Sequence, residues 1–250
     1  MDLSELPASV DLWFAEPARM TEALRGAYLA LCDPDERARH QRITHDETRA
    51  HHLLTRALVR TTLSRYERRE PSAWRFTFND YGCPFITPSQ ATRGLHFNVS
   101  HTTDLIVCAV TRGRALGVDV EFEPRKSATT KIAKRFFSAP EVQALERLPE
   151  AEQRERFFCY WTLKEAYIKA RGLGLAIPLK DFWFDVESSD AIRFDNTPSL
   201  NDDPQGWWFA RFRASPAHPL AVALSGDPAQ TVIIRAFDVT PLEGFHERSL

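Results

Sequence analysis

Long apolar stretches are missing from this chain of 250 residues, and cysteines are few. The longest unbroken apolar run, residues 105–110, is far shorter than the roughly 20 residues that cross a membrane. The acidic start of the chain lacks the apolar core of a secretory signal. The cysteines form no C-x-x-C pair, which argues against a zinc site or a small disulfide scaffold. We therefore expect a cytoplasmic protein with no membrane partner.

Lysine is absent before Lys126, although the net charge of the whole chain is only −2. Such a near-neutral balance argues against a nucleic-acid partner. The hydrophobic fraction of 43% and the charged fraction of 26% are typical of folded chains and exclude global disorder. The glycine-rich P-loop and the G-x-G-x-x-G motif of dinucleotide-binding proteins are missing as well.

Arginine takes the place of lysine in the first half of the chain and is concentrated in residues 37–69. Arg42, Arg49 and Arg56 recur at heptad spacing and Arg60 follows one helical turn later, so the four can form one stripe on a helix. Guanidinium groups suit phosphate oxygens. A solvent-exposed basic face is the alternative, and it is favoured for most of these arginines taken individually.

Hydrophobic periodicity predicts an α+β fold. Helices are expected over residues 20–31, 35–68 (in two pieces, the second from about Asp46), from Ser138 with Glu141 completing a capping box, and 151–170. Strands are expected over residues 10–15, 74–78, 95–99, 105–110, 116–122, 182–186, 191–194, 207–212, 220–224 and 232–237. Helices followed by strands occur on each side of about residue 115. This order indicates two similar α+β halves, residues 1–115 and 116–250, with an active site between them.

The segment 117–123 alternates strictly between apolar and acidic residues. In a strand, Asp119, Glu121 and Glu123 share one face, where uncompensated carboxylates repel one another. A hard divalent cation such as Mg²⁺ would relieve that repulsion. Taken alone, the segment favours the alternative of a half-buried strand with a solvated acidic face.

The helix predicted over 151–170 carries Glu165 and Lys169 one turn apart, with Trp161 one turn before Glu165. An ordinary surface ion pair would explain the first two residues. The helix is nevertheless apolar around much of its circumference, which indicates burial. A buried carboxylate needs a cation or a metal ion to stay charged.

Ser100 and His101 follow Asn98 at the end of a predicted strand. Adjacent side chains in extended backbone point apart, so Ser100 and His101 do not form a nucleophilic dyad. They suit hydrogen bonding to an anion. A polar turn explains them equally well.

Four segments together resemble the Sfp-type 4′-phosphopantetheinyl transferases. They occur in that family's order: Tyr81-Gly-Cys-Pro84, Phe97-Asn-Val-Ser-His101, Gly117-Val-Asp-Val-Glu121 and Trp161-Thr-Leu-Lys-Glu-Ala-Tyr-Ile-Lys169. The resemblance implies a monomer of two pseudo-symmetric α+β halves that binds coenzyme A and Mg²⁺ in the cleft between them. Residues 1–115 would bind the nucleotide of coenzyme A, and residues 116–250 would supply the metal-binding acids and the catalytic helix.

The implied reaction moves the 4′-phosphopantetheine group of coenzyme A to a serine of an acyl or peptidyl carrier protein and releases adenosine 3′,5′-bisphosphate. By the same resemblance, Asp119, Glu121 and Glu165 would hold Mg²⁺. Glu165 would also act as general base, and Lys169 would neutralise the pyrophosphate and assist departure of the bisphosphate.

The resemblance also implies a set of coenzyme A contacts: Arg39, Arg56, Tyr81, Gly82, Pro84, Ser100, His101 and Lys169. Two positions depart from the family's pattern, because Cys83 stands where Lys or Arg is frequent and Glu36 stands near a position where relatives can have a cation. Arg39, Arg49 or Arg56 would compensate.

Two other functions use the same residues. A non-catalytic protein that binds coenzyme A or a carrier is one, although simple binding does not need a full set of metal ligands. A metal-dependent phosphohydrolase that uses water as nucleophile is the other. The sequence leaves the carrier open among fatty acid, polyketide, nonribosomal peptide and siderophore synthesis.

Overall fold

The computed structural model describes residues 8–90, 92–124, 129–186 and 192–250. The chain divides into two compact units. Unit 1 contains Met1–Phe78, Pro84–Gly113 and Val232–Leu250, and unit 2 contains Asn79–Cys83 and Arg114–Thr231. Each unit combines helices with a sheet, so the predicted α+β class is confirmed.

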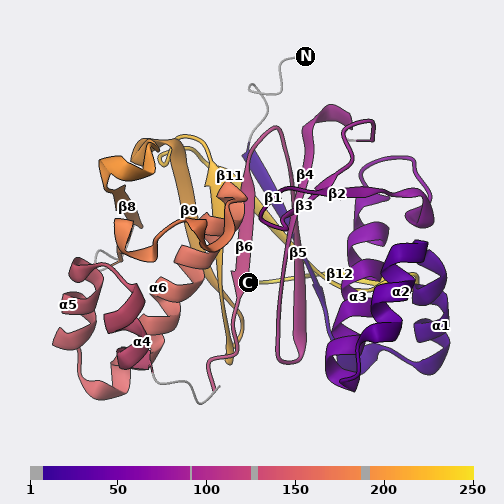
Figure 1. Ribbon diagram of the computed structural model, residues 1–250, viewed down its shortest axis with the longest axis horizontal. Helices are drawn as coiled ribbons and strands as arrows, with labels where there is room; N and C mark the ends of the chain where they lie inside the picture. Colours follow the sequence, from indigo (N-terminus) through magenta and orange to yellow (C-terminus); the bar gives the residue numbers. More distant parts are fainter. Residues whose placement is uncertain (1–7, 91, 125–128, 187–191) are drawn as a thin grey trace. The chain divides into compact units, whose positions relative to one another are not determined.

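Unit 1 has a five-stranded sheet in the order β12-β11-β1-β5-β4. Its strands are β1 (Ala8–Ala15), β4 (Leu95–Thr102), β5 (Leu105–Arg112), β11 (Val232–Thr240) and β12 (Gly244–Arg248). Three helices lie beside this sheet (Figure 1): α1 (Glu22–Leu31), α2 (Pro34–Arg42) and α3 (Asp46–Leu63). Apolar side chains of α1, α3, β1 and β5 form its core. A small hairpin joins β2 (Phe76–Phe78) to β3 (Pro84–Ile86).

The last strands belong to unit 1 because β11 pairs with β1 in parallel. Asp11 on β1 is buried and lies opposite Arg235 on β11. The Arg235 guanidinium donates to both carboxylate oxygens of Asp11, at 2.7 and 2.8 Å. This two-point contact fixes the register between distant parts of the chain. The unit boundaries therefore differ from the expected division into 1–115 and 116–250, both here and at residues 79–83.

Unit 2 has a three-stranded sheet in the order β6-β10-β9, built from β6 (Leu116–Val120), β10 (His218–Ser225) and β9 (Trp207–Ser215). A separate hairpin pairs β7 (Phe182–Asp185) with β8 (Arg193–Asn196). The helices are α4 (Thr129–Phe136), α5 (Ala139–Arg147) and α6 (Glu150–Arg171). Helix α6 packs on β6 and β10, and its aromatic and aliphatic side chains make up much of the core.

The predicted helices are confirmed, although the one expected to reach residue 68 ends at Leu63. Ser138 and Glu141 form the expected capping box at the start of α5. Helix α6 ends at Gly172, whose φ of 65° is left-handed and suits glycine. The short strands β3 and β12 were not predicted.

Short 3₁₀ turns occur at Pro17–Arg19, Pro71–Ala73, Thr92–Gly94, Gly174–Ala176, Leu179–Asp181, Pro198–Leu200 and Pro204–Gly206. Among the helices described, none is both long and apolar enough to cross a membrane.

Candidate active site

Strand β6 and helix α6 approach each other closely at Gly117. A Cβ on this residue would lie 1.9 Å from the backbone oxygen of Ala166 and 2.5 Å from the nitrogen of Ala170. Only glycine fits such an approach. Because side chains alternate along a strand, Asp119 and Glu121 also point from β6 toward α6.

Asp119 meets Lys169 of α6. The Lys169 ammonium lies 2.7 Å from Asp119 Oδ1 and donates to the Val118 carbonyl at 3.2 Å. Asp119 is only 4% exposed, so the solvated acidic face is wrong for this residue. Lys169 reaches across to the strand and supplies the cation that a buried carboxylate needs.

Glu121 meets Trp161 two turns earlier on the same helix. The Trp161 indole N–H donates to Glu121 Oε1 at 2.9 Å. Trp161 therefore binds Glu121, directly after β6, and Lys169 binds Asp119 of β6, while Glu165 lies between Trp161 and Lys169 on the predicted helix face.

Glu165 experiences the charge of both neighbouring acids. Burial raises the pKa of its carboxyl to about 7, and the carboxylates of Asp119 and Glu121 add to the rise, while Lys169 opposes it. A proton therefore binds to Glu165 near neutral pH. The structure thus brings together all four residues that the sequence assigned to the metal and the reaction.

The site's donor chemistry fits Mg²⁺, because three carboxylates offer hard oxygen ligands and the positive charge of Lys169 does not offset the effects of burial and of the two neighbouring carboxylates on Glu165. In the described part of the chain, no three His, Cys, Asp or Glu side chains form a ready-made metal cluster. Lys169 instead neutralises Asp119. A divalent ion held by Asp119, Glu121 and Glu165 would supply the remaining charge.

The turn at residues 79–83 is anchored on the end of α6, within the same unit. The Asn79 side-chain amide donates to the Gly172 carbonyl at 2.5 Å, and its oxygen accepts from the backbone N–H groups of Tyr81 and Cys83. Gly82 has a left-handed φ of 79°. Burial raises the pKa of the Cys83 thiol, and nearby Lys169 lowers it. An Asn at the start of residues 79–84 indicates a turn from the sequence alone, and the structure confirms this turn.

The other predicted coenzyme A contacts lie in unit 1. Ser100 is buried on β4, and the exposed His101 beside it has its ring 5.7 Å from that of His51 on α3. Pro84 begins β3. Arg39 is exposed on α2.

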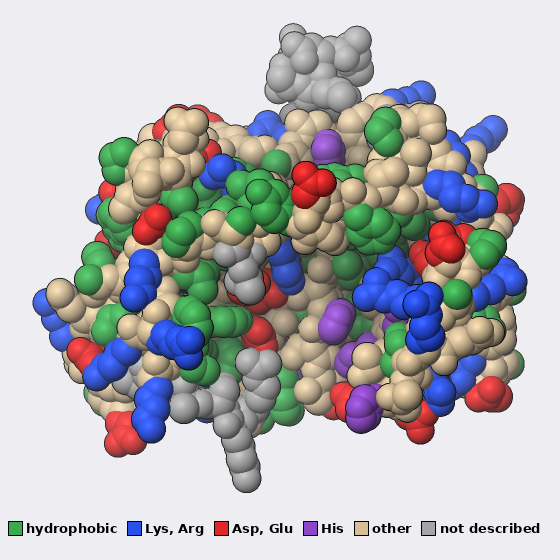
Figure 2. Space-filling model, in the orientation of Figure 1, with side chains coloured by type: hydrophobic (Ala, Val, Ile, Leu, Met, Phe, Trp, Pro, Cys, Tyr) green, Lys and Arg blue, Asp and Glu red, His purple; other side chains and the backbone are tan. Residues whose placement is uncertain are grey.

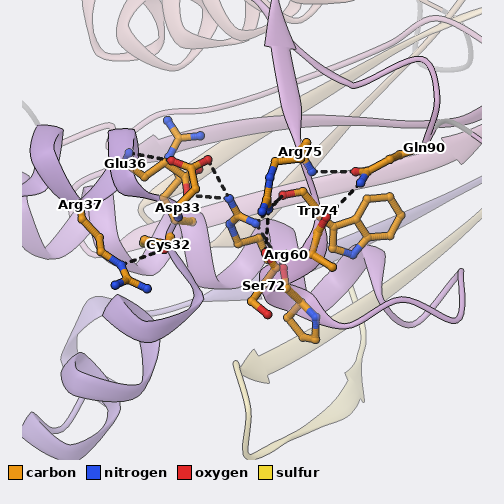
Figure 3. Close-up of polar contacts among 12 residues, drawn as sticks. Cys32, Asp33, Glu36, Arg37, Arg60, Ser72, Trp74, Arg75 and Gln90 are labelled. Atoms are coloured by element: carbon orange, nitrogen blue, oxygen red, sulfur yellow. Dashed lines mark hydrogen bonds and ion pairs between the residues drawn. The ribbon is translucent and has the colours of Figure 1, made fainter.

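Arg60 does not continue a phosphate-facing stripe, which corrects the sequence interpretation. Its guanidinium is fully buried and binds Glu36 at 2.6 Å and the Trp74 carbonyl at 2.7 Å (Figure 3). Arg56 also lies 3.6 Å from Glu36. Glu36 completes the α2 capping box with Asp33. Its negative charge therefore holds α2 against α3 and stabilises two arginines that face inward.

Two histidines join the arginines between α2 and α3. The rings of His40 and His52 stack with centroids 5.8 Å apart. Both ring nitrogens of His52 are buried without a hydrogen-bond partner among the described residues. Burial lowers the pKa of His52 to about 4, and Arg56, Arg39 and His40 contribute. We call Arg39, His40, His52 and Arg56 the basic cluster; Figure 2 shows cationic and histidine side chains gathered over α2 and α3. The sequence interpretation missed the histidines.

A cavity of unit 2 lies away from these residues. It has a volume of about 1180 Å³ and opens between β7, β8, β9 and the first half of α6. None of the predicted site residues lines it.

Comparisons with a family model and with individual proteins both find similarity to 4′-phosphopantetheinyl transferases. Residues 115–223 match the 4′-phosphopantetheinyl transferase superfamily. The chain is 36% identical to the 4′-phosphopantetheinyl transferase HetI of Nostoc sp. over 175 residues, which cover 70% of this chain and 73% of HetI. It is 30% identical to the 4′-phosphopantetheinyl transferase Sfp of Bacillus subtilis over 195 residues, which cover 78% and 83% of the two chains. A further 4′-phosphopantetheinyl transferase of Bacillus subtilis is 34% identical over 194 residues, covering 78% and 82%.

Proposed function

The chain belongs to the 4′-phosphopantetheinyl transferase superfamily, and we propose that it uses Mg²⁺ and the acids of β6 and α6 to carry out that family's reaction. It transfers the 4′-phosphopantetheine group of coenzyme A to a serine of a carrier protein. The observation that carries the proposed chemistry is the placement of Glu165 beside Asp119 and Glu121, with Lys169 on the same helix face.

At phosphorus the reaction makes one bond and breaks one, and the serine O–H bond breaks as well. The serine oxygen of the carrier bonds to the phosphorus that bears the pantetheine arm, and the bond from that phosphorus to the pyrophosphate bridging oxygen breaks. The products are the holo-carrier, adenosine 3′,5′-bisphosphate and a proton. The protein therefore has to position the reactants, neutralise phosphate charge and accept the proton.

We assign those tasks to four residues. Asp119, Glu121 and Glu165 would hold Mg²⁺, whose positive charge would neutralise the pyrophosphate. Glu165 is also assigned to accept the serine proton, directly or through water. The Lys169 ammonium, held beside Asp119, stabilises the negative charge of the departing bisphosphate.

We assign the phosphates of coenzyme A to cationic and polar groups outside the acidic centre, which consists of Asp119, Glu121 and Glu165. Arg39 and Arg56 of the basic cluster, with Ser100 and His101 of β4, are the proposed phosphate contacts in unit 1. The turn at Tyr81 and Gly82, together with Pro84, is the proposed contact for the nucleotide. Exposed Arg39 is the proposed source of the positive charge that Cys83 and Glu36 do not supply, because Arg56 also pairs with Glu36.

Helix α4 is the proposed dock for the carrier protein. Its described side chains Lys131, Lys134 and Arg135 are exposed, and Phe136 beside them is 39% exposed. Carrier domains in this family's chemistry are generally acidic helical bundles, so the charges are complementary. A monomer in the cytoplasm without a nucleic-acid partner remains our prediction for the state in which the chain acts.

The test is a panel of apo acyl and peptidyl carrier proteins incubated with coenzyme A, with Mg²⁺ or with EDTA. We expect Mg²⁺-dependent addition of the phosphopantetheine mass to at least one carrier. No mass increase on any carrier would reject the transferase. Binding of coenzyme A without turnover would instead indicate the non-catalytic alternative, and release of bisphosphate without a carrier would indicate the phosphohydrolase.

A further inference from the structure

A fully buried ion pair lies inside unit 2, next in sequence to Glu165. Lys164 of α6 and Glu141 of α5 both have side chains with no exposed surface, and their charged atoms are 2.8 Å apart. Neither residue has a task in the proposed reaction. Their burial nevertheless requires an explanation, because charges are rarely taken out of water without one.

The Lys164 ammonium has an acceptor for each of its three hydrogens. It donates to Glu141, to the Leu179 carbonyl at 2.8 Å and to the Phe182 carbonyl at 2.6 Å. These acceptors come from α5, from the turn before β7 and from the start of β7. A single side chain of α6 therefore binds three other segments.

Glu141 extends this connection. Its carboxylate accepts from the backbone and the hydroxyl of Ser138 at 3.1 and 2.8 Å, and from the Phe184 N–H at 3.1 Å. The capping box of α5 and the backbone of β7 thus share one carboxylate with Lys164. We call Lys164 and Glu141 the buried clamp.

Stability alone is a weak reason for such an arrangement. The cost of removing two charges from water offsets much of the attraction between them. Well-packed apolar residues in their place often give equal or greater stability. Apolar packing has no preferred direction, whereas hydrogen bonds do. The buried clamp therefore fixes the position of α6 through hydrogen bonds to specific backbone carbonyls.

Neighbouring residues of an α-helix point about 100° apart. The clamp on Lys164 therefore sets the rotation of α6 about its axis, and with it the direction of Glu165. On the strand side, the close approach at Gly117 sets the distance between α6 and β6. Together the two contacts define where the Glu165 carboxylate meets Asp119 and Glu121.

We propose that Lys164 is a positioning residue, which holds Glu165 in register with the acids of β6 so that the three carboxylates bind one divalent ion. This inference rests on the proposed function, since it deepens the account of the same site. It predicts that metal affinity depends on Lys164, although Lys164 touches neither metal nor substrate.

The test compares Lys164→Met with the double variant K164M/E141Q, using Mn²⁺ as the probe. K164M leaves Glu141 buried and unpaired, so we expect a fall in Tm of roughly 10 °C. The double variant removes both charges and should regain most of that loss. Mn²⁺ affinity, measured by electron paramagnetic resonance of the free ion well below either Tm, should stay at least tenfold weaker than wild type in both variants. The kcat for transfer should fall at least tenfold in both.

Lys180→Met is the matched control, because Lys180 is an exposed lysine in the same turn that accepts from Lys164. It should change neither Tm nor Mn²⁺ affinity. Wild-type Mn²⁺ affinity in the stable double variant would overturn the proposal and leave the clamp a purely structural pair. Wild-type protein that binds Mn²⁺ but modifies no carrier would reject the proposed function, while the Mn²⁺ titrations would still decide the role of Lys164.

Discussion

Gly117 of β6 lies so close to Ala166 of α6 that a Cβ on residue 117 would stand 1.9 Å from the Ala166 carbonyl oxygen. The obstacle is helix backbone, which cannot move aside as a flexible side chain can. The distance between strand and helix at this point therefore depends on the absence of a side chain. The contact between Asp119 and Lys169 lies directly beyond it on the same face.

Gly117→Ala should separate β6 from α6. We expect a loss of about 1–3 kcal/mol in the free energy of unfolding, because overpacking at a tight contact strains both elements. Transfer activity should fall at least tenfold as Asp119 and Lys169 move apart. Denaturant unfolding and a carrier-modification assay measure the two effects. Gly26→Ala on α1 is the control, since nothing lies within 4 Å of its Cβ position; equal effects at the two glycines would contradict the explanation.

Glu165→Gln should stabilise the metal-free protein at high pH. Folding raises the pKa of Glu165 from 4.5 to about 7, so the folded state holds its proton more tightly than the unfolded state. The wild type should therefore lose stability relative to the variant as pH rises from 4.5 through 7, by about 2–3 kcal/mol at pH 8. Unfolding in EDTA across this range measures the difference. Transfer activity should be lost.

With Mg²⁺ present at high pH, we expect the wild type to become more stable than Glu165→Gln. Added Mg²⁺ should raise the Tm of the wild type more than that of Glu165→Gln, because the variant lacks one ligand. Glu152→Gln, an exposed acid on the same helix, should behave as the wild type in both measurements. Identical pH profiles for the wild type and Glu165→Gln would contradict the buried, proton-binding state.

Substitutions at Arg60 and at Arg39 should have different effects, the first on stability and the second on coenzyme A binding. Arg60→Met leaves Glu36 and two backbone carbonyls without their buried partner, which should lower the free energy of unfolding by about 3–5 kcal/mol. Arg39→Met should leave stability nearly unchanged, because Arg39 is exposed, and should raise the KM for coenzyme A several-fold. Thermal unfolding and steady-state kinetics test the pair, and an unchanged KM in Arg39→Met would remove that residue from the coenzyme A site.

His52→Asn should flatten the pH dependence of stability on the acid side. Folding lowers the pKa of His52 from 6.5 to about 4, so the unfolded state binds the proton more readily. The wild type should be fully stabilised above pH 6.5 and should lose up to about 2–3 kcal/mol as pH falls toward 4. His45→Asn changes an exposed histidine and should retain the wild-type slope. The same slope in His52→Asn would show that another group causes it.

Local patterns in the sequence determined much of this protein. The capping box at Ser138, the end of α6 at Gly172 and the alternation through Asp119 and Glu121 all depend on neighbours within one helical turn or one strand. The residue types of the acidic centre were evident for the same reason, since Glu165 and Lys169 lie one turn apart.

Tertiary structure alone decided which segments meet. Arg235 binds Asp11 across most of the chain, so no local spacing predicts that the last strands join the first. Arg60 lies one helical turn after Arg56 on α3, yet burial against Glu36 and the Trp74 carbonyl makes it structural. Lys164 looks in sequence like one more charge on a helix. Its acceptors at Glu141, Leu179 and Phe182 come together only after the chain folds, because hydrogen bonding to a buried ammonium depends on distance in space rather than on separation in sequence.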